Sequence, residues 1–194
     1  MNSDKQLWIL AGGNGAGKTT WYEQFLKPRG MPFINADILA ATLDAEHPEN
    51  ASYMAATLAE QLRLSLIRSS ASFCFETVFS HPSKIDFMAE AKSLGYELIL
   101  VYIHLETDEL NQARVAQRVD AGGHSVPTEK IISRIPRTVS NISRALPLAD
   151  YAVLYDNSSH SRPYRSVAEI KRGALSIKAE PLPAWARAVL ADYL

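Results

Sequence analysis

A glycine-rich loop near the start of this chain constrains its possible folds more than any other feature. Residues 12–19 read Gly-Gly-Asn-Gly-Ala-Gly-Lys-Thr and fit the pattern G-x-x-x-x-G-K-[ST]. The apolar run 7–11 before the loop predicts a strand buried on both faces, and a helix is expected from Gly17 to before Pro28. A strand, a glycine-rich loop and a helix in this order are typical of a phosphate-binding loop.

The chemistry of a triphosphate explains the spacing of this loop. Glycines let consecutive backbone N–H groups point inward, and the helix N-terminus adds a partial positive charge. We expect Lys18 to contact the β and γ phosphates and the Thr19 hydroxyl to be a ligand of Mg²⁺. The alternative is a chance match in a glycine-rich turn, which the flanking strand and helix disfavour. The expected nucleotide-binding residues are Gly12, Gly13, Asn14, Gly15, Ala16, Gly17, Lys18, Thr19 and Thr20.

Strands alternate with helices along the rest of the chain, which predicts an α/β fold with a parallel sheet and helices on both faces. Within one of these helices, Met54, Leu58, Leu62 and Leu66 recur four residues apart and are expected on one apolar face. The expected strands are 32–35, 72–77, 96–104 and 151–155, and the expected helices are 37–43, 50–69, 83–94, 107–121 and 128–146.

The length of 194 residues and the absence of an obvious linker predict a single domain, residues 1–194. We expect a helical lid at roughly 107–146, and a short hairpin with a final helix at roughly 159–194.

Two acidic residues follow predicted strands at their carboxyl ends, where open α/β sheets bind ligands. Asp37 comes shortly after the strand at 32–35, and Glu76 lies at the end of the strand at 72–77. A carboxylate can orient an acceptor hydroxyl and take its proton, so Asp37 is the expected base; the alternative is that it only caps the next helix. Glu76 is expected to hold the acceptor or to order water on Mg²⁺, with a purely structural role as the alternative. Thr77 either donates to the substrate or closes the strand.

Arginines at helical spacing predict contacts to phosphate. Arg114 and Arg118 are four residues apart in one predicted helix, and Arg134 and Arg137 are three apart in the next. The glycine-containing segment 122–127 joins the two helices and is the expected hinge of the lid. Cations that close over the moving phosphoryl group stabilise its charge and exclude water. The alternative is that these arginines are solvated or paired with nearby acids.

The charge balance and the cysteine count exclude some classes of protein. The chain has 20 Lys and Arg against 21 Asp and Glu, and this net charge of −1 gives no general attraction to nucleic acid or acidic lipid. Cys74 is the single cysteine, so an intrachain disulfide is impossible, which fits a reducing compartment. No apolar run reaches the roughly 20 residues that span a bilayer, and no signal peptide is recognisable, so we expect a cytoplasmic protein.

Together these segments resemble the zeta-toxin family of P-loop kinases, particularly its short bacterial members. The resemblance covers roughly residues 6–158. It implies a five-stranded parallel sheet in the order 2-3-1-4-5, with helices on both faces and a helical lid that carries arginines. It rests on the loop, on Asn35-Ala36-Asp37, Phe75-Glu76-Thr77 and the stretch from Arg118 to Pro127, and it extends to Arg134–Arg137 with Asn141 and to Tyr155–Ser158.

The resemblance also implies ATP- and Mg²⁺-dependent phosphorylation of a hydroxyl on a small molecule. In zeta toxins the acceptor is a UDP-activated amino sugar, and an antitoxin protein can cover the nucleotide site. By motif match, Lys18 would be the phosphate lysine, Asp37 the base, Arg118 and Arg134 the lid arginines, and Glu76 and Thr77 residues that hold the acceptor.

The leading expectation is therefore a small-molecule kinase, with Arg114 and Arg137 as further phosphate contacts. One alternative is an ATP-binding regulatory module with incidental turnover. Another is a polynucleotide kinase, which the near-neutral charge and the lack of a basic stripe with interleaved aromatics disfavour. Asp156 and Asn157, after the last predicted parallel strand, either contact a base or form a turn.

Overall fold

The computed structural model describes residues 5–120 and 126–194, and every strand and helix predicted from the sequence has a counterpart in it. The elements are β1 (Gln6–Ala11), α1 (Lys18–Phe25), β2 (Phe33–Ile34), α2 (Ala36–Leu43), α3 (Ser52–Arg68), β3 (Phe73–Thr77), α4 (Ser83–Ser93), β4 (Glu97–His104), α5 (Asp108–Asp120), α6 (Thr128–Ala145), β5 (Tyr151–Asp156), β6 (Arg165–Lys171), β7 (Ala174–Ile177) and α7 (Ala184–Val189).

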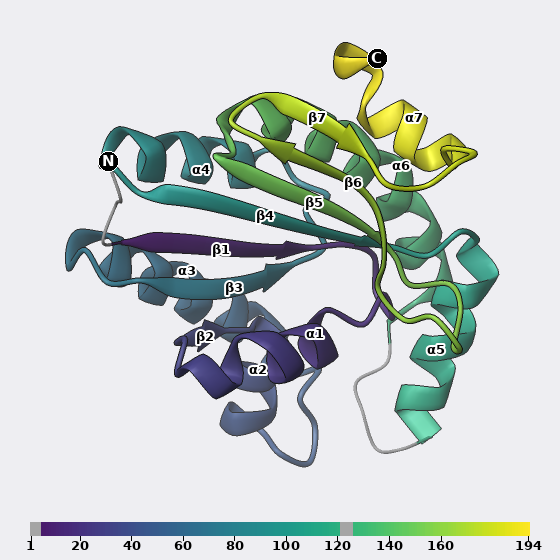
Figure 1. Cartoon of the computed structure of the whole chain (residues 1–194). Coiled ribbons are helices and arrows are strands. Elements are labelled where there is room, and N and C mark those ends of the chain that lie inside the picture. Colours follow the sequence, from purple (N-terminus) through teal and green to yellow (C-terminus); the bar gives the residue numbers. More distant parts are fainter. Residues whose placement is uncertain (1–4, 121–125) are drawn as a thin grey trace.

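The sheet has seven strands in the order β2-β3-β1-β4-β5-β6-β7 (Figure 1). The first five are parallel and follow the expected order. The prediction of a five-stranded, wholly parallel sheet is wrong, because the C-terminal hairpin joins it: β6 pairs antiparallel with β5, and β7 with β6. The hairpin occupies the backbone donors and acceptors on the outer edge of β5, which a five-stranded sheet would leave unpaired.

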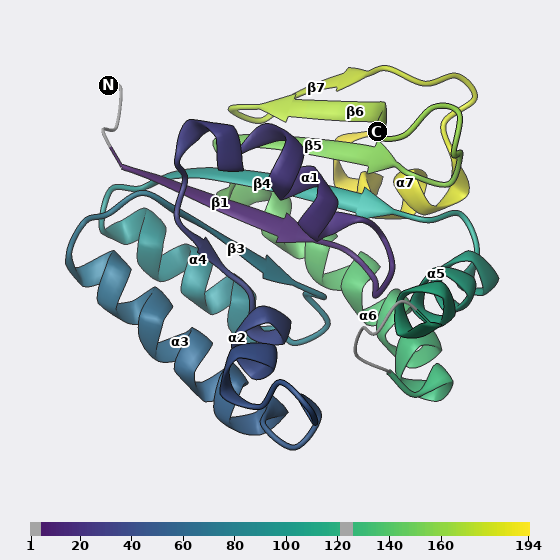
Figure 2. The ribbon, with the colours of Figure 1, turned by 90° about the horizontal axis from the view of Figure 1, so that it is seen from below.

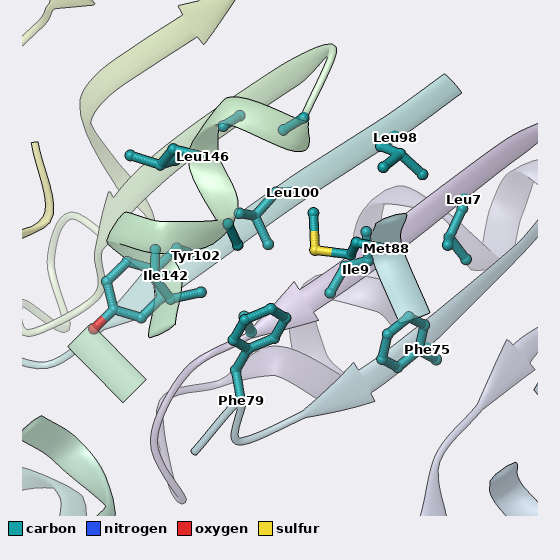
Figure 3. Close-up of a cluster of buried hydrophobic side chains, with 14 of the residues drawn as sticks. Leu7, Ile9, Phe75, Phe79, Met88, Leu98, Leu100, Tyr102, Ile142 and Leu146 are labelled. Atoms are coloured by element: carbon teal, nitrogen blue, oxygen red, sulfur yellow. The ribbon is translucent and has the colours of Figure 1, made fainter. Parts of the chain in front are cut away.

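Side chains of successive strand residues alternate between two apolar layers, as the pleat of a strand requires. One layer contains Ile9, Phe75 and Leu100, which pack with Met88 of α4 and with Phe79 (Figure 3). The other layer includes Leu10 and Val101 of the sheet and Trp21 of α1. In Figure 2, α1 lies on one side of the sheet, whereas α3, α4 and α6 lie on the other. The predicted helices on both faces are therefore present.

The buried face of α3 differs from the one that its leucines indicated. The buried residues of this helix are Ala55, Ala59, Arg63 and Ile67, whereas Met54 is 61% exposed. Ala55 packs with Ala40 of α2 and with Ala51, the N-cap of α3, and small side chains let the helices approach closely. Contact with a neighbouring helix, rather than the size of the apolar side chains, decided which face of α3 is buried. An arginine is buried there as a result.

The arrowheads of β1, β3 and β4 point toward the side of the molecule where α5 lies (Figures 1 and 2). The loop after β1 and the segments after β2 and β3 therefore meet at one edge of the sheet. Within the described part of the chain, none of the helices has the length and apolar character needed to cross a membrane.

Candidate active site

A cleft of about 680 Å³ lies where the chain leaves β1, β2 and β3, and this volume is within the range of small-molecule sites. Its lining comes from the glycine-rich loop, the N-terminus of α2, α3, the segment after β3, and the helices α5 and α6. Residues predicted separately to contact the nucleotide, the acceptor and the lid therefore line one cavity.

The glycine-rich loop has the backbone conformation that its glycines allow. Gly15 and Gly17 have φ angles of +76° and +95°, in the left-handed region that other residues rarely adopt. Gly17 also caps α1 and, having no side chain, makes no capping hydrogen bond to the backbone N–H groups of the first turn. Those N–H groups and the helix dipole are suited to an anion.

Three side chains that are distant in sequence hold the backbone of the loop. Asn157 is buried, and its Nδ2 donates to the Ala16 carbonyl at 2.8 Å. The Tyr164 hydroxyl donates to the Gly17 carbonyl at 2.8 Å, and Asn111 Nδ2 donates to the Asn14 carbonyl at 2.6 Å. Asn157 Oδ1 also accepts the Tyr164 N–H at 3.1 Å. The turn predicted after β5 is present, because Asp156 Oδ1 accepts the Ser158 N–H at 2.9 Å, and the Asn157 side chain in addition supports the loop.

A histidine lies behind the same loop. His104 Nδ1 is 2.7 Å from the Tyr102 hydroxyl, and the His104 carbonyl accepts the Asn157 N–H. Burial lowers the pKa of His104 to about 4, although the charge of Asp156 opposes this shift. The imidazole beneath the loop is therefore neutral at neutral pH.

Glu76 at the end of β3 connects the loop to the next part of the site. The Thr19 hydroxyl donates to Glu76 Oε2 at 2.6 Å, and Asn35 Nδ2 donates to the same oxygen at 2.9 Å. Lys18 Nζ lies 3.5 Å from Glu76 Oε1 and donates to the Gly13 carbonyl at 2.9 Å. This network places a carboxylate beside both the lysine and the hydroxyl of the loop. Asn35 had no predicted role of its own, although an Asn before a helix signals a cap.

Asp37 is the second residue of α2 and does not cap that helix. Asn35 is the cap, because its Oδ1 accepts the N–H groups of Asp37 and Ile38 at 2.8 and 3.3 Å. The Asp37 carboxylate lies 3.7 Å from Arg118 Nη1, and about half of its side-chain surface is exposed to the cleft and solvent. The capping alternative for Asp37 is therefore wrong, and its carboxylate lines the cavity beside a predicted lid arginine.

The structure brings three of the four candidate arginines to the cleft. Arg114 donates to the Asn157 carbonyl at 2.8 Å, Arg118 pairs with Asp37, and Arg134 Nη1 is 3.4 Å from Asn14 Oδ1. Arg137 does not line the cleft, because its guanidinium donates to Ser133 within α6. The predicted hinge, residues 122–127, lies outside the described residues except for Val126 and Pro127.

The segment after β3 also lines the cleft. The Thr77 hydroxyl accepts the N–H of Phe79, whose φ of +63° is unusual for a residue other than glycine. Thr138 and Asn141 of α6 donate to the carbonyls of Val78 and Phe79 at 2.8 and 3.0 Å. Asn141 therefore helps to fix the path of this segment.

The charge of the cleft differs from that of the whole chain. Two carboxylates, Asp37 and Glu76, are among the described residues of its lining. The cationic side chains there are Lys18, Arg63, Lys84, Arg114, Arg118, Lys130 and Arg134. Such an excess of positive charge in a concave site attracts anions. A net charge of −1 for the chain thus conceals a strongly basic cleft.

Comparison with known proteins gives one curated relative and several similar structures. An uncharacterized protein of Haemophilus influenzae is 31% identical over 129 residues, which cover 63% of this chain and 91% of that protein. A chain of the AvrRxo1-ORF1:AvrRxo1-ORF2 complex with sulphate ions is 19% identical with a TM-score of 0.76, over 92% of this chain and 62% of that chain. The same complex with ATP gives a TM-score of 0.73 at 20% identity, over 91% and 61%.

The PezAT toxin–antitoxin system of Streptococcus pneumoniae contains another similar chain, with a TM-score of 0.65 and 20% identity over 87% of this chain and 72% of that one. These structural likenesses show a P-loop kinase-like α/β fold. This chain spans 62% of the length of the AvrRxo1 chain. The sequence pattern of the AAA domain family matches residues 7–138, from β1 through the loop into α6. Because this match covers more than half of the sequence, the chain belongs to the AAA domain family of P-loop proteins.

Proposed function

We propose that this chain is a kinase of zeta-toxin type, which transfers the γ-phosphoryl group of ATP to a hydroxyl of a small molecule. The observation that carries the proposal is the position of Asp37, beside Arg118 and in the same cleft as Lys18 of the loop. Phosphoryl transfer needs a group that orients the acceptor hydroxyl and cations that stabilise the moving phosphoryl group. The carboxylate and the arginines of the cleft are suited to these two tasks, which supports the proposal.

In this proposal the triphosphate lies against residues 12–20. The uncapped N–H groups of the first turn of α1 and the Lys18 ammonium contact its phosphates. The similar AvrRxo1 complex was solved with ATP, which supports ATP as the nucleotide. Asn157, Tyr164 and Asn111 keep the loop in shape for that contact.

Mg²⁺ fits the oxygen atoms at the start of α1. This ion binds through one or two protein oxygens together with substrate phosphates and retained waters. Thr19 Oγ1 lies 2.6 Å from Glu76 Oε2, so a hydroxyl ligand and a carboxylate that can order metal-bound water are side by side. When bound, the ion would neutralise charge on the phosphates.

The remaining side chains act on the acceptor and on the transferred group. Asp37 accepts the proton of the acceptor hydroxyl as that oxygen bonds to the γ-phosphorus. The bond between the γ-phosphorus and the β–γ bridging oxygen breaks, and ADP leaves with that electron pair. Arg118 and Arg134 stabilise the charge on the moving group, with Arg114 as a further contact. Glu76 and Thr77 help to position the acceptor.

The finer features of the proposal follow the zeta-toxin resemblance. The acceptor would be a UDP-activated amino sugar or a related molecule, and residues 107–146 would form a lid of a single cytoplasmic domain. The AvrRxo1-ORF1:AvrRxo1-ORF2 complex and the PezAT toxin–antitoxin system each contain a second protein, which supports a partner of antitoxin type here.

The proposal is tested by incubating the protein with γ-labelled ATP and a metabolite extract that includes UDP-amino sugars. We expect a labelled small molecule whose mass has increased by one phosphoryl group. Asp37→Asn should lower kcat by about 10³-fold, because general base catalysis contributes roughly 10²–10⁴-fold, and should leave ATP affinity unchanged. Asp44→Asn, at the opposite end of α2, is the matched control.

Three results would count against this assignment. Undiminished transfer by Asp37→Asn would show that this residue is not the base. Nucleotide-dependent binding of a protein without any labelled small molecule would favour a regulatory module. Salt-sensitive labelling of oligonucleotide ends would favour a polynucleotide kinase.

A further inference from the structure

The end of the cleft formed by α3 and α4 contains two cations that the proposed transfer does not use. Arg63 of α3 and Lys84 of α4 line the same cavity as Asp37. Neither belongs to the glycine-rich loop or to the predicted lid. Their surroundings determine what this end of the cleft can bind.

Arg63 is buried, and no carboxylate of the described residues lies within ion-pair distance of it. Only 8% of its surface is exposed. Its guanidinium lies over the rings of Phe75 and Phe87, with 5.2 and 5.7 Å to the ring centroids. Cation–π contacts offset part of the cost of burying a charge, and they engage the face of the guanidinium rather than its in-plane N–H donors. Burial lowers the pKa of Arg63, and the charge of Glu60 on the same helix partly opposes this shift.

Lys84 adds a second positive charge to the same environment. Lys84 lines the same cavity as Arg63; burial and the charge of Arg63 lower the pKa of Lys84, whereas the charge of Glu60 opposes this shift. Within residues 5–120 and 126–194, no ion pair includes Lys84 either. Two neighbouring cations that face a cavity are stabilised when an anion enters it.

The wall around these cations is suited to an oxyanion. Ser80 and His81, from the segment after β3, add a hydroxyl and an imidazole to the lining, and Ala59 of α3 contributes only a methyl group. A guanidinium presents paired donors that match the two oxygens of a carboxylate or phosphate. The contacts from α6 to the Val78 and Phe79 carbonyls fix the segment that leads into α4, so this wall is already formed.

We infer that the acceptor carries an oxyanionic group, a phosphate ester or a carboxylate, which Arg63 and Lys84 bind while the acceptor hydroxyl lies at Asp37. This inference rests on the proposed kinase function. A neutral acceptor would leave the buried Arg63 unpaired, so this end of the cleft selects for anions. The charge of the cleft is thereby divided: the loop and lid cations contact ATP, and Arg63 and Lys84 contact the acceptor.

The test compares acceptors in matched pairs, each a hydroxylated phosphate ester or carboxylate beside its neutral counterpart. We expect wild-type protein to phosphorylate the anionic member of a pair and to prefer it by about 10-fold or more, because a charged hydrogen bond is worth roughly 1.5–3 kcal/mol. Separate sets of phosphate esters and hydroxycarboxylates show which anion the site accepts. Equal kcat/KM values for anionic and neutral members would overturn the inference.

Variants then assign the anion contact to these residues. Lys84→Gln should raise the KM for the anionic acceptor by about 10- to 100-fold and leave the kcat and the KM for ATP almost unchanged. Arg63→Gln should do the same, and Arg63→Lys should recover part of the loss. Arg68→Gln, at the exposed end of α3, is the matched control. An unchanged acceptor KM in Lys84→Gln would contradict the assignment.

A binding experiment separates failure of this inference from failure of the proposed function. Inorganic phosphate is titrated into protein saturated with a non-hydrolysable ATP analogue, which occupies the loop. If no acceptor is phosphorylated but phosphate binds to the wild type and not to Lys84→Gln, the kinase proposal fails and the anion site stands. If phosphate binds to neither protein, the anion site is refuted whatever the outcome for transfer.

Discussion

The two ends of the cleft satisfy their charges in different ways. At the loop end, Lys18 lies beside Glu76, and Glu76 also accepts hydrogen bonds from Thr19 and Asn35. At the α3–α4 end, Arg63 has aromatic rings beneath it and no carboxylate partner among the described side chains. Lys18 at the loop end therefore has a carboxylate partner within the protein, whereas none of the ion pairs among the described residues includes the two cations at the α3–α4 end.

This difference separates the two tasks of a phosphotransferase. A preorganised loop can bind the phosphates of a nucleotide whatever the acceptor is, because its donors are already held in position. An uncompensated pair of cations contributes little to nucleotide binding and instead discriminates between acceptors. Substitutions at the two ends should accordingly change different kinetic constants.

The largest effect is expected at the loop end. Lys18→Ala should lower kcat/KM for ATP by about 10⁴-fold, because one donor to a developing charge is worth roughly 10²–10³ in kcat and nucleotide affinity falls as well. Lys84→Gln should leave that constant unchanged. The measurement is steady-state kinetics with ATP as the varied substrate, and Lys27→Ala, at a 63% exposed side chain, is the control. A large effect of Lys84→Gln on kcat/KM for ATP would show that the two ends of the cleft do not bind separate substrates.

The next largest effect is on the free energy of unfolding; it depends on pH and comes from His104, which lies behind the loop. Burial lowers the pKa of His104 from its ordinary value of 6.5 to about 4. Between pH 4 and pH 6.5, this imidazole therefore binds a proton in the unfolded chain but not in the folded chain. The free energy of unfolding should therefore be highest above pH 6.5 and decrease as the pH falls toward 4, by up to about 3 kcal/mol.

Denaturant unfolding at several pH values measures this decrease. His104→Gln should reduce the slope over that interval, whereas His160→Gln, at an exposed position, should not. If both variants retain the slope of the wild type, the acid sensitivity has another origin than the imidazole behind the loop.

The smallest effect distinguishes support of the loop from support of the fold. Tyr164→Phe removes a hydroxyl that donates to the Gly17 carbonyl, and Tyr22→Phe removes a hydroxyl that donates to the Met31 carbonyl at 2.7 Å. Each should lower the free energy of unfolding by about 1 kcal/mol. Only Tyr164→Phe should also weaken ATP binding, by a few fold, in a titration with a fluorescent analogue. Equal nucleotide affinity in the two variants would show that the loop does not depend on Tyr164.

Much of the fold and part of the site could be predicted from the sequence, because these features depend on short stretches of chain. The loop motif lies between an apolar run and a helix start, so its place in an α/β fold follows from local chemistry. Asp37 and Glu76 were expected in the cleft because the carboxyl ends of parallel strands meet at one edge. Arg114, Arg118 and Arg134 were expected there from helical spacing, and all three line the cleft.

The tertiary structure alone decided the features that depend on contacts between distant segments. The hairpin could be recognised locally, but its pairing with β5 depends on an edge that exists only once the sheet has formed. Asn157 and Tyr164 support a loop some 140 residues earlier in the chain, as the separations of 141 and 147 residues show. Arg137 lies on the helix that carries Arg134, yet it faces away from the cleft.

Arg63 is the clearest example of a feature that the local sequence does not predict and that the tertiary structure decides. The leucines of its helix indicated a different buried face, and nothing in the local sequence marks this arginine as buried. It became part of the cleft because α3 packs through its alanines and because Phe75 and Phe87 provide rings for its guanidinium. The sequence by itself determined that the chain has a phosphate-binding loop and two acids near the carboxyl ends of parallel strands. Only packing decided which cations remain uncompensated, because the charge balance of a site depends on every element that surrounds it.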